Sequence, residues 1–164
     1  MRSLRLCVRI DIKKMRNLPG TYALILISSS DQLIEIGKLG RVSVQPGFYV
    51  YAGSAFGPGG IKARIAHHKR IAARPHWHID YLRAYLHLVE IWYTYDCGHH
   101  EHLWASVLGC SKGATTPIPG FGASDCRCKS HLYLISFKPS ARRFRDKLRA
   151  KLNGHGRIFT HKLK

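Results

Sequence analysis

Two tyrosines, an arginine, a histidine and a glutamate have the types and the order to act on a phosphodiester. Tyr22 opens one apolar run and Tyr51 ends another, while Arg64 and His68 stand four residues apart beyond them. Hydrolysis of a phosphodiester requires an activated water, a cation for the charge that develops on the phosphate, and usually a divalent metal held by a carboxylate. Glu101 is a candidate for that carboxylate, because only seven acidic residues lie between the basic ends of the chain.

The patterns of the sequence predict an α/β fold of the α+β type, in which helices flank a small central sheet of mostly antiparallel strands. Apolar, β-branched runs predict strands at 22–27, 33–36, 48–51, 86–95 and 131–137, with a further short strand or arm at 4–12. Helical spacing and caps predict helices at 61–73, 76–82, 99–108 and 141–152. Glycines and prolines predict a loop at 109–128.

Two of these helices are predicted to carry reactive side chains toward the sheet. In the helix at 61–73, one face is formed by Ile61, Arg64, His68 and Ile71. Arg64 and His68 are then one turn apart and point back toward the strand ends that carry the tyrosines. In the helix at 99–108, Glu101 lies on an apolar stripe, where it either compensates the helix dipole or points into a site.

The chain has 164 residues and a formal charge of +18, which indicates a polyanionic partner. The two ends, residues 1–19 and 139–164, together hold +13 of this charge. We therefore predict a basic N-terminal arm or strand at 1–19, a folded domain at 20–138, and a basic C-terminal helix and tail at 139–164. The alternative is that the ends are solvated basic tails without a specific role.

The cysteine content and the apolar runs indicate in which cellular compartment the protein is expected. Five cysteines, an odd number, and the lack of an apolar leader favour a reduced, intracellular and cytoplasmic protein. No apolar run approaches the ~20 residues that a membrane span requires. We therefore expect a soluble protein that has no membrane partner.

Each candidate site residue also has a purely structural explanation. Tyr22 and Tyr51 could be core aromatics of adjacent strands. Arg64 could pair with a surface carboxylate, and His68 could be a hydrogen-bonded imidazole in the core. The joint pattern, with all of them in one order along the chain, favours a common site.

Together, these residues resemble the motifs of the GIY-YIG nucleases. Gly20-Thr-Tyr22 and Tyr51-Ala-Gly53 correspond to the two motifs that name the family, and an arginine, a histidine and a glutamate follow in the family's order. Three longer stretches are similar to the Uri-type branch of this superfamily, whose members are small predicted endonucleases. They are FYVYAGSA at 48–55, HWHIDYL at 76–82 and GFGASDCRCKSHL at 120–132.

The resemblance implies a divalent-metal-dependent endonuclease that hydrolyses DNA phosphodiester bonds. Tyr22 and Tyr51 would line the site, and one of them would orient or deprotonate the attacking water. Arg64 would stabilise the charged transition state, and His68 would polarise Tyr22 or contact the phosphate. Glu101 would hold one Mg²⁺ or Mn²⁺, and no small-molecule cofactor is expected. Because the family includes enzymes that act on single strands, we expect single-stranded or branched DNA as the substrate.

Further polar and basic residues are expected to contact the nucleic acid. In the segment 76–82, aromatic and polar side chains alternate in a way that is typical of a base-stacking edge. We expect Trp77 and Tyr81 to pack in the core, and His78 and Asp80 to face a substrate groove. The full predicted set is Ser54, Lys62, His67, Lys69, Arg70, His78, Asp80, Arg142, Arg143 and Arg145.

A second chemically active cluster is Cys126-x-Cys128-x-x-His131. These three soft ligands could bind a structural zinc ion. Structural zinc more often uses Cys-x-x-Cys pairs, so we favour a loop whose thiols, serine and aspartate hydrogen-bond the backbone. Asp125 in this loop could also reach the active site. The candidates for a fourth zinc ligand are Cys97, Cys110, His99, His100 and His102.

Two other functions are compatible with the same sequence. One is a catalytically inactive module that keeps the fold and binds DNA or RNA. The other is a scaffold protein that contains zinc. Dependence of cleavage on Glu101 and Tyr22 separates the nuclease from the first alternative, and the zinc content of the purified protein tests the second.

Overall fold

The strand β1 (Thr21–Ser28) lies at the centre of the structure, because its side chains are apolar on both faces. Leu24 and Leu26 are fully buried on one face, and Ala23 and Ile25 are fully buried on the other. A continuous apolar run of this length is typical of a strand that is covered on both sides. The sheet is therefore built outward from β1 in both directions.

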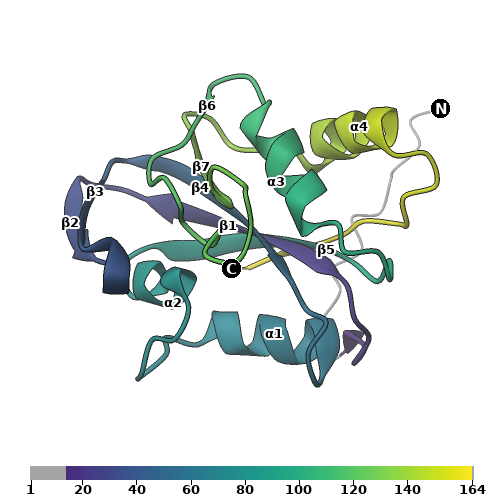
Figure 1. Cartoon of the computed structure of the whole chain (residues 1–164), viewed down its shortest axis with the longest axis horizontal. Helices are drawn as coiled ribbons and strands as arrows, with labels where there is room; N and C mark the ends of the chain where they lie inside the picture. The colour runs from purple at the N-terminus through teal and green to yellow at the C-terminus, as the bar shows by residue number, and fades with distance from the viewer. Residues whose placement is uncertain (1–13, 164) are drawn as a thin grey trace.

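The computed structural model describes residues 14–163 and contains a six-stranded sheet in the order β6-β7-β4-β1-β5-β8 (Figure 1). All pairings in this sheet are antiparallel, as predicted for the α+β fold. A separate hairpin is formed by β2 (Gln32–Glu35) and β3 (Arg41–Val44). The other elements are the 3-10 helix η2 (Gly37–Leu39), β4 (Gly47–Ser54), α1 (Gly60–Lys69), α2 (His78–Arg83), β5 (His87–Thr94), α3 (Glu101–Gly109), β6 (Ala114–Thr115), β7 (Leu132–Ile135), α4 (Ala141–Lys151) and β8 (Phe159–Lys162).

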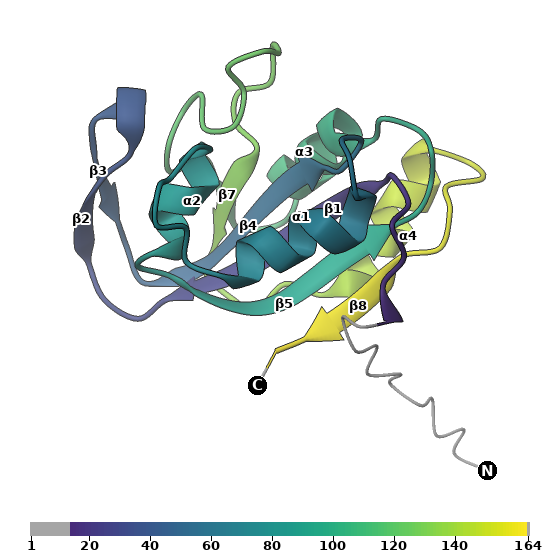
Figure 2. The same ribbon diagram turned by 90° about the horizontal axis from the view of Figure 1, so that it is seen from below.

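The helices cover the sheet in two layers. Figures 1 and 2 show α1 and α2 on one face of the sheet and α3 and α4 on the other. The first layer buries Ile61 and Ile65 of α1 against the even-numbered residues of β1. The second layer buries Trp104 of α3 and Phe144 of α4 against the odd-numbered ones. Residues from both layers reach the end of the sheet where β1 begins and β4 ends.

The predicted elements are largely confirmed, but some of their bounds differ, and the strands β3, β6 and β8 were not predicted. The helix predicted at 61–73 ends at Lys69, because Arg70 is already extended (φ −91°, ψ 153°). Ile71 therefore lies outside the helix and is 64% exposed, so its predicted place on one helical face with Ile61, Arg64 and His68 is wrong. The loop predicted at 109–128 contains the two-residue strand β6, which pairs with β7. The strand predicted at 4–12 lies outside the described residues.

The C-terminal segment differs most from the sequence-based expectation. A tail was expected after the basic helix, but Phe159–Lys162 forms β8 and pairs with β5 at the edge of the sheet. Ile158 is buried in the same cluster as Trp92 and Leu148, and the Phe159 ring stacks on Tyr93. The tail prediction is wrong because a short run with only two apolar residues pairs with a strand that is distant in the sequence.

None of the helices in residues 14–163 is long and apolar enough to cross a membrane. The longest described helix, α4, has eleven residues, and it is strongly basic on its exposed side.

The buried position of Ile158 leads to a stability prediction. Ile158→Ala should lower the free energy of unfolding by about 2–4 kcal/mol, because it removes a buried side chain and leaves a cavity between α4 and the sheet. Urea unfolding followed by circular dichroism measures this loss. Lys151→Ala, at an exposed position on α4, serves as the control. If both variants have the same stability, the C-terminal segment is loosely attached and β8 does not contribute to the core.

Candidate active site

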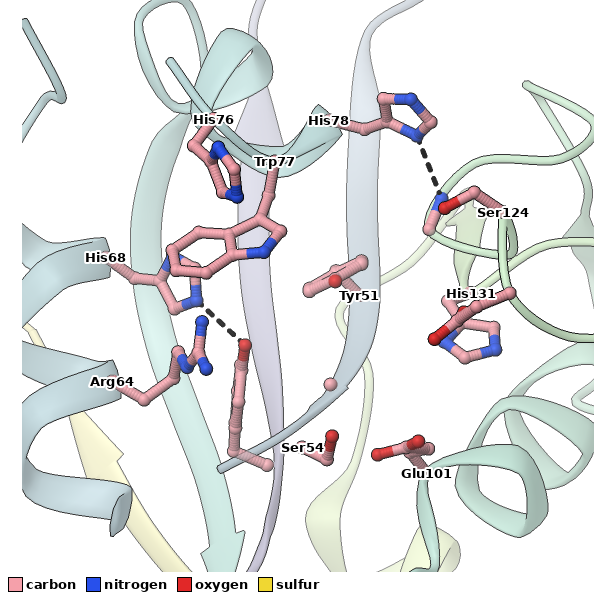
Figure 3. Close-up of a pocket in the computed structure, with 14 residues that line it drawn as sticks. Tyr51, Ser54, Arg64, His68, His76, Trp77, His78, Glu101, Ser124 and His131 are labelled. Atoms are coloured by element: carbon pink, nitrogen blue, oxygen red, sulfur yellow. Dashed lines mark hydrogen bonds between the residues drawn. The ribbon is translucent and has the colours of Figure 1, made fainter. Parts of the chain in front are cut away.

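A cavity of about 330 Å³ lies at the end of the sheet where β1 begins and β4 ends. All five residues predicted to be catalytic line it, although they come from β1, β4, α1 and α3 (Figure 3). In Figure 3, Arg64 and His68 enter from one side and Glu101 from the opposite side. The lining residues are Tyr22, Tyr51, Gly53, Ser54, Arg64, His68, His76, Trp77, His78, Glu101, Gly122, Ser124, Asp125 and His131.

The register of β1 and β4 places the two tyrosines on one face. Tyr22 is directly opposite Gly53, and Tyr51 is directly opposite Leu24, so the tyrosines are diagonal neighbours. Their ring centroids lie 6.5 Å apart. A Cβ atom on Gly53 would lie 2.5 Å from the Tyr22 hydroxyl oxygen. The glycine of the second motif is therefore required to make room for the phenol of the first.

Tyr22 and His68 form a buried pair. The Tyr22 hydroxyl lies 2.8 Å from His68 Nε2, and the two rings are 5.4 Å apart. Burial, and the neighbouring phenol of Tyr51, raise the pKa of Tyr22 well above its usual range. Burial, together with the neighbouring imidazole of His67, lowers the pKa of His68 to about 3. Near neutral pH the pair therefore consists of an un-ionised phenol and a neutral imidazole.

Asp80 lies behind this pair and does not face the cavity. Its side chain is 2% exposed, and its Oδ1 accepts a 2.9 Å hydrogen bond from His67 Nε2. Its Oδ2 accepts from the backbone N–H groups of His76 and Trp77. Burial opposes ionisation, but these hydrogen bonds outweigh it and lower the pKa of Asp80. The predicted exposure of Asp80 to a groove is wrong, because the residue caps the start of α2 from inside.

The position of the Asp80 carboxylate favours one tautomer of His68. His68 Nδ1 lies 3.9 Å from Asp80 Oδ1 and has no hydrogen-bond partner among the described residues. A proton on Nδ1 faces this negative charge and leaves Nε2 free to accept the Tyr22 hydroxyl proton. Asp80, His68 and Tyr22 thus form a chain of polar groups that ends in the cavity.

Arg64 and Trp77 form the exposed edge of the cavity. The Arg64 guanidinium carbon lies 4.2 Å from the centroid of the Trp77 ring, which is a cation–π contact. Trp77 is 39% exposed, so its predicted place in the core is wrong. It stays at the surface because it precedes α2 and lies over the guanidinium. Tyr81 is partly buried against the core, as predicted.

Glu101 begins α3 and points into the cavity from the side opposite α1. The helix start is held near β4 by the stacked rings of Phe56 and His99, whose centroids are 3.8 Å apart. Figure 3 shows the Glu101 carboxylate directed toward the Ser54 hydroxyl. Its Oε2 is buried and has no hydrogen-bond partner in the part of the chain that is described. A buried carboxylate oxygen without a partner in a polar cavity fits a hard divalent cation.

The loop between β6 and β7 closes the cavity on the remaining side. The Gly122 N–H donates to His78 Nδ1 (3.2 Å), which connects this loop to the start of α2. His78 thus lines the cavity, as predicted, and so does Asp125. The sequence-based site did not include Ser124 and His131, which also line it. The signal for them was the 120–132 stretch, whose contact with the site depends on the tertiary structure.

Residues that could hold a metal also occur beside the cavity. His102, Cys126, Cys128 and His131 offer four ligand atoms that all lie within 4.8 Å of one another. Two further groups, His67-His68-Asp80 and Asp96-His100-His155, are similarly close. Most members of these two groups already hydrogen-bond one another or the backbone, and His68 bonds the Tyr22 hydroxyl. Cys97, Cys110, Cys126 and Cys128 form no disulfide.

The remaining residues predicted to bind nucleic acid occupy two separate surfaces. Ser54 lines the cavity, whereas Lys62, Lys69 and Arg70 lie on α1 or directly after it, outside the lining. His67 is half-buried and bonded to Asp80. The three arginines at 142, 143 and 145 lie on α4, in the layer of helices on the other face of the sheet. Of these two helices, α1 contributes residues to the lining of the cavity and α4 does not.

The lowered pKa of His68 predicts a loss of stability in acid. The His68 imidazole binds a proton near pH 6.5 in the unfolded chain but only near pH 3 in the folded chain. The free energy of unfolding is therefore unaffected by this group above pH 6.5, and it falls as the pH drops from 6.5 toward 3. The loss at about pH 4.5 should be ~2–3 kcal/mol relative to pH 7. In His68→Gln, whose amide stays neutral, urea unfolding at both pH values should show a loss smaller by this amount. Equal losses in the two proteins would contradict the buried neutral state.

Comparison with protein families matches residues 21–153 to the domain of unknown function DUF123. The match covers all the strands and helices from β1 to α4, including every residue of the cavity. No curated protein and no solved structure gives a significant match. Since the match extends over most of the chain, the protein belongs to the DUF123 family.

Proposed function

We propose that this protein is a divalent-metal-dependent endonuclease of the GIY-YIG superfamily, of the Uri type, and that it hydrolyses phosphodiester bonds in DNA. The observation that carries the proposal is the convergence of five side chains on one cavity. Tyr22 and Glu101 are almost eighty residues apart in sequence, and the five come from four separate elements. Residues that serve only to pack the core are not expected to direct two phenols, a guanidinium, an imidazole and a carboxylate into one polar cavity.

In the proposed mechanism, Tyr22 activates the attacking water. With the imidazole proton on Nδ1, Tyr22 donates its own proton to His68 Nε2, so the phenolic oxygen can accept a proton from water as it passes its own to the imidazole. Burial disfavours a charged imidazole, but the Asp80 carboxylate on the far side compensates part of that cost. Asp80 and His68 therefore act together as a proton acceptor behind the tyrosine. Tyr51 lies within reach to orient the same water.

Arg64 supplies the positive charge in this mechanism. Its guanidinium can donate two parallel hydrogen bonds to phosphate oxygens. It also lowers the pKa of Tyr22 and Tyr51, although burial outweighs this effect in both. The cation that binds the phosphate is thus also the group that helps the phenol to give up its proton.

The metal would be held by Glu101, with the Ser54 hydroxyl and the Asp125 carboxylate as further oxygen ligands in the same cavity. An all-oxygen set with few protein ligands suits Mg²⁺ or Mn²⁺, which keep several waters. When bound, such an ion stabilises the charge on the scissile phosphate and on the leaving oxygen. In this mechanism, Tyr22 with His68 activates the water, and Arg64 binds the phosphate.

Single-stranded or branched DNA fits the rim of the cavity better than a regular duplex. The exposed ring of Trp77 lies beside the exposed His76, where it could stack on an unpaired base. The net charge of +18 supplies affinity that does not depend on sequence. Since the cavity opening is edged by aromatic side chains, a base turned out of a helix could also occupy it.

A cleavage assay with labelled single-stranded, duplex and branched DNA, with RNA as a comparison, tests the proposed activity. With Mg²⁺ or Mn²⁺ present, the wild type should cut DNA, and Tyr22→Phe, Arg64→Ala and Glu101→Gln should each lower the rate at least about 100-fold. Glu35→Gln, which changes an exposed carboxylate in the β2–β3 hairpin, should leave the rate unchanged. Circular dichroism spectra of the variants show whether each one is folded.

Two results of this assay would decide against the proposal. Cleavage that persists in Glu101→Gln would show that the activity comes from a contaminant or from another site. Binding of DNA or RNA without any cleavage by the wild type would instead identify an inactive binding module on the same fold.

The stacking role of Trp77 leads to a separate prediction for binding. Trp77→Ala should weaken the binding of single-stranded DNA by about 1–3 kcal/mol, or roughly 5- to 150-fold, because a base loses its stacking surface. Fluorescence anisotropy without divalent metal measures the change. Tyr85→Ala removes another exposed aromatic ring outside the cavity and should have little effect. Equal weakening of single-stranded and duplex DNA by Trp77→Ala would argue against stacking on an unpaired base.

A further inference from the structure

We propose that His102, Cys126, Cys128 and His131 bind one structural zinc ion beside the cavity. The four ligand atoms come from α3 and from the loop that leads into β7, and they all lie within 4.8 Å of one another. The sequence contains three of these ligands as Cys126-x-Cys128-x-x-His131, and the fold supplies the fourth from a residue twenty-four positions earlier. The proposal does not depend on nuclease activity, because it concerns a different set of residues.

The distances between the ligand atoms match a tetrahedral zinc site. With Zn–S bonds near 2.3 Å and Zn–N bonds near 2.0–2.1 Å, neighbouring ligand atoms in a tetrahedron lie about 3.3–3.8 Å apart. Cys126 Sγ lies 3.4 Å from His131 Nε2, and Cys128 Sγ lies 3.3 Å from His102 Nδ1. Each sulfur is thus already placed at the separation that a shared zinc ion requires from a histidine nitrogen.

The ligand types also distinguish this site from the proposed magnesium site. Two thiolates and two imidazoles are soft or intermediate ligands that select zinc over magnesium or calcium. Four protein ligands complete a tetrahedron and leave no open position for water or substrate, which is the arrangement of a structural site. The hydrogen-bonded loop favoured from the sequence is the weaker explanation, because the thiols face imidazole nitrogens in the structure.

The surroundings of His102 support the same assignment. Its Nδ1 faces Cys128, and its Nε2 lies 3.7 Å from Glu101 Oε1. Histidines that bind metals commonly direct the second ring nitrogen at a carboxylate, which fixes the orientation of the ring. The proposed zinc ligand thus lies next to the same glutamate that points into the cavity.

The zinc ion would fasten the loop from Gly120 to His131 to the start of α3. This loop carries Gly122, Ser124 and Asp125, which close one side of the cavity. In residues 116–131 the structure has no strand or helix, and a few hydrogen bonds to neighbouring segments hold it. A metal link at its C-terminal half supplies the rigidity that secondary structure does not provide there.

Metal analysis of the purified full chain tests the site. Protein prepared without chelator and dialysed against a slight excess of zinc should retain about one equivalent. The double variant Cys126→Ser/Cys128→Ser should retain less than about a tenth of an equivalent. The matched control Cys97→Ser/Cys110→Ser removes two exposed cysteines and should retain the full amount. Less than about a tenth of an equivalent in the wild type, bound iron in place of zinc, or equal zinc in the two double variants would overturn the proposal.

Two measurements on the wild type do not depend on whether the serine variant folds. Cobalt that replaces zinc should show visible absorption of a tetrahedral ion and a thiolate charge-transfer band, and a spectrum of octahedral cobalt would overturn the site. Arg127 and Lys129 are exposed on either side of Cys128, so trypsin should cut there faster once a chelator removes the metal. Unchanged cleavage after zinc is removed would show that the ion does not hold the loop.

Discussion

The antiparallel register between β1 and β4 is the constraint on which the site depends. It places Tyr22 opposite Gly53 and keeps Tyr51 on the same face, two positions along. A shift of one residue between the two strands would put the two phenols on opposite faces of the sheet, because the side chains of a strand alternate between faces. Burial of β1 on both sides makes such a shift costly, since every side chain from Tyr22 to Leu26 would change its environment. The packing of the core thereby fixes the geometry of the cavity.

Electrostatics in this protein combines a strongly basic chain with buried neutral groups. The formal charge is +18, yet the phenol and imidazole at the bottom of the cavity are uncharged near neutral pH. Asp80 is the buried anion beside them, and it is stabilised by two backbone N–H groups and by His67. This arrangement allows one proton to move from Tyr22 to His68 when a water is deprotonated. The proposed hydrolase mechanism uses that capacity.

The cavity is completed by segments that do not belong to the regular sheet. The start of α2 and the loop before β7 meet through the hydrogen bond from Gly122 to His78. The proposed zinc site would join the same loop to α3, next to Glu101. The start of α2, this loop and the start of α3 would then be connected by specific polar contacts around the cavity. Such contacts position catalytic groups more closely than packing of a loop alone can do.

Many elements of the fold and several residues of the candidate site could be predicted from the sequence. Continuous apolar runs identified β1 and β5, a serine before Ala141 identified the start of α4, and the spacing of Arg64 and His68 placed both on one side of α1. Only the tertiary structure decided which polar residues face the cavity, since Asp80 is buried and Trp77 exposed, against expectation. It also decided the pairing of β8 and the meeting of His102 with the cysteine loop. The reason is that local spacing fixes the periodicity of an element, whereas contacts between distant segments depend on how the elements pack, which periodicity does not encode.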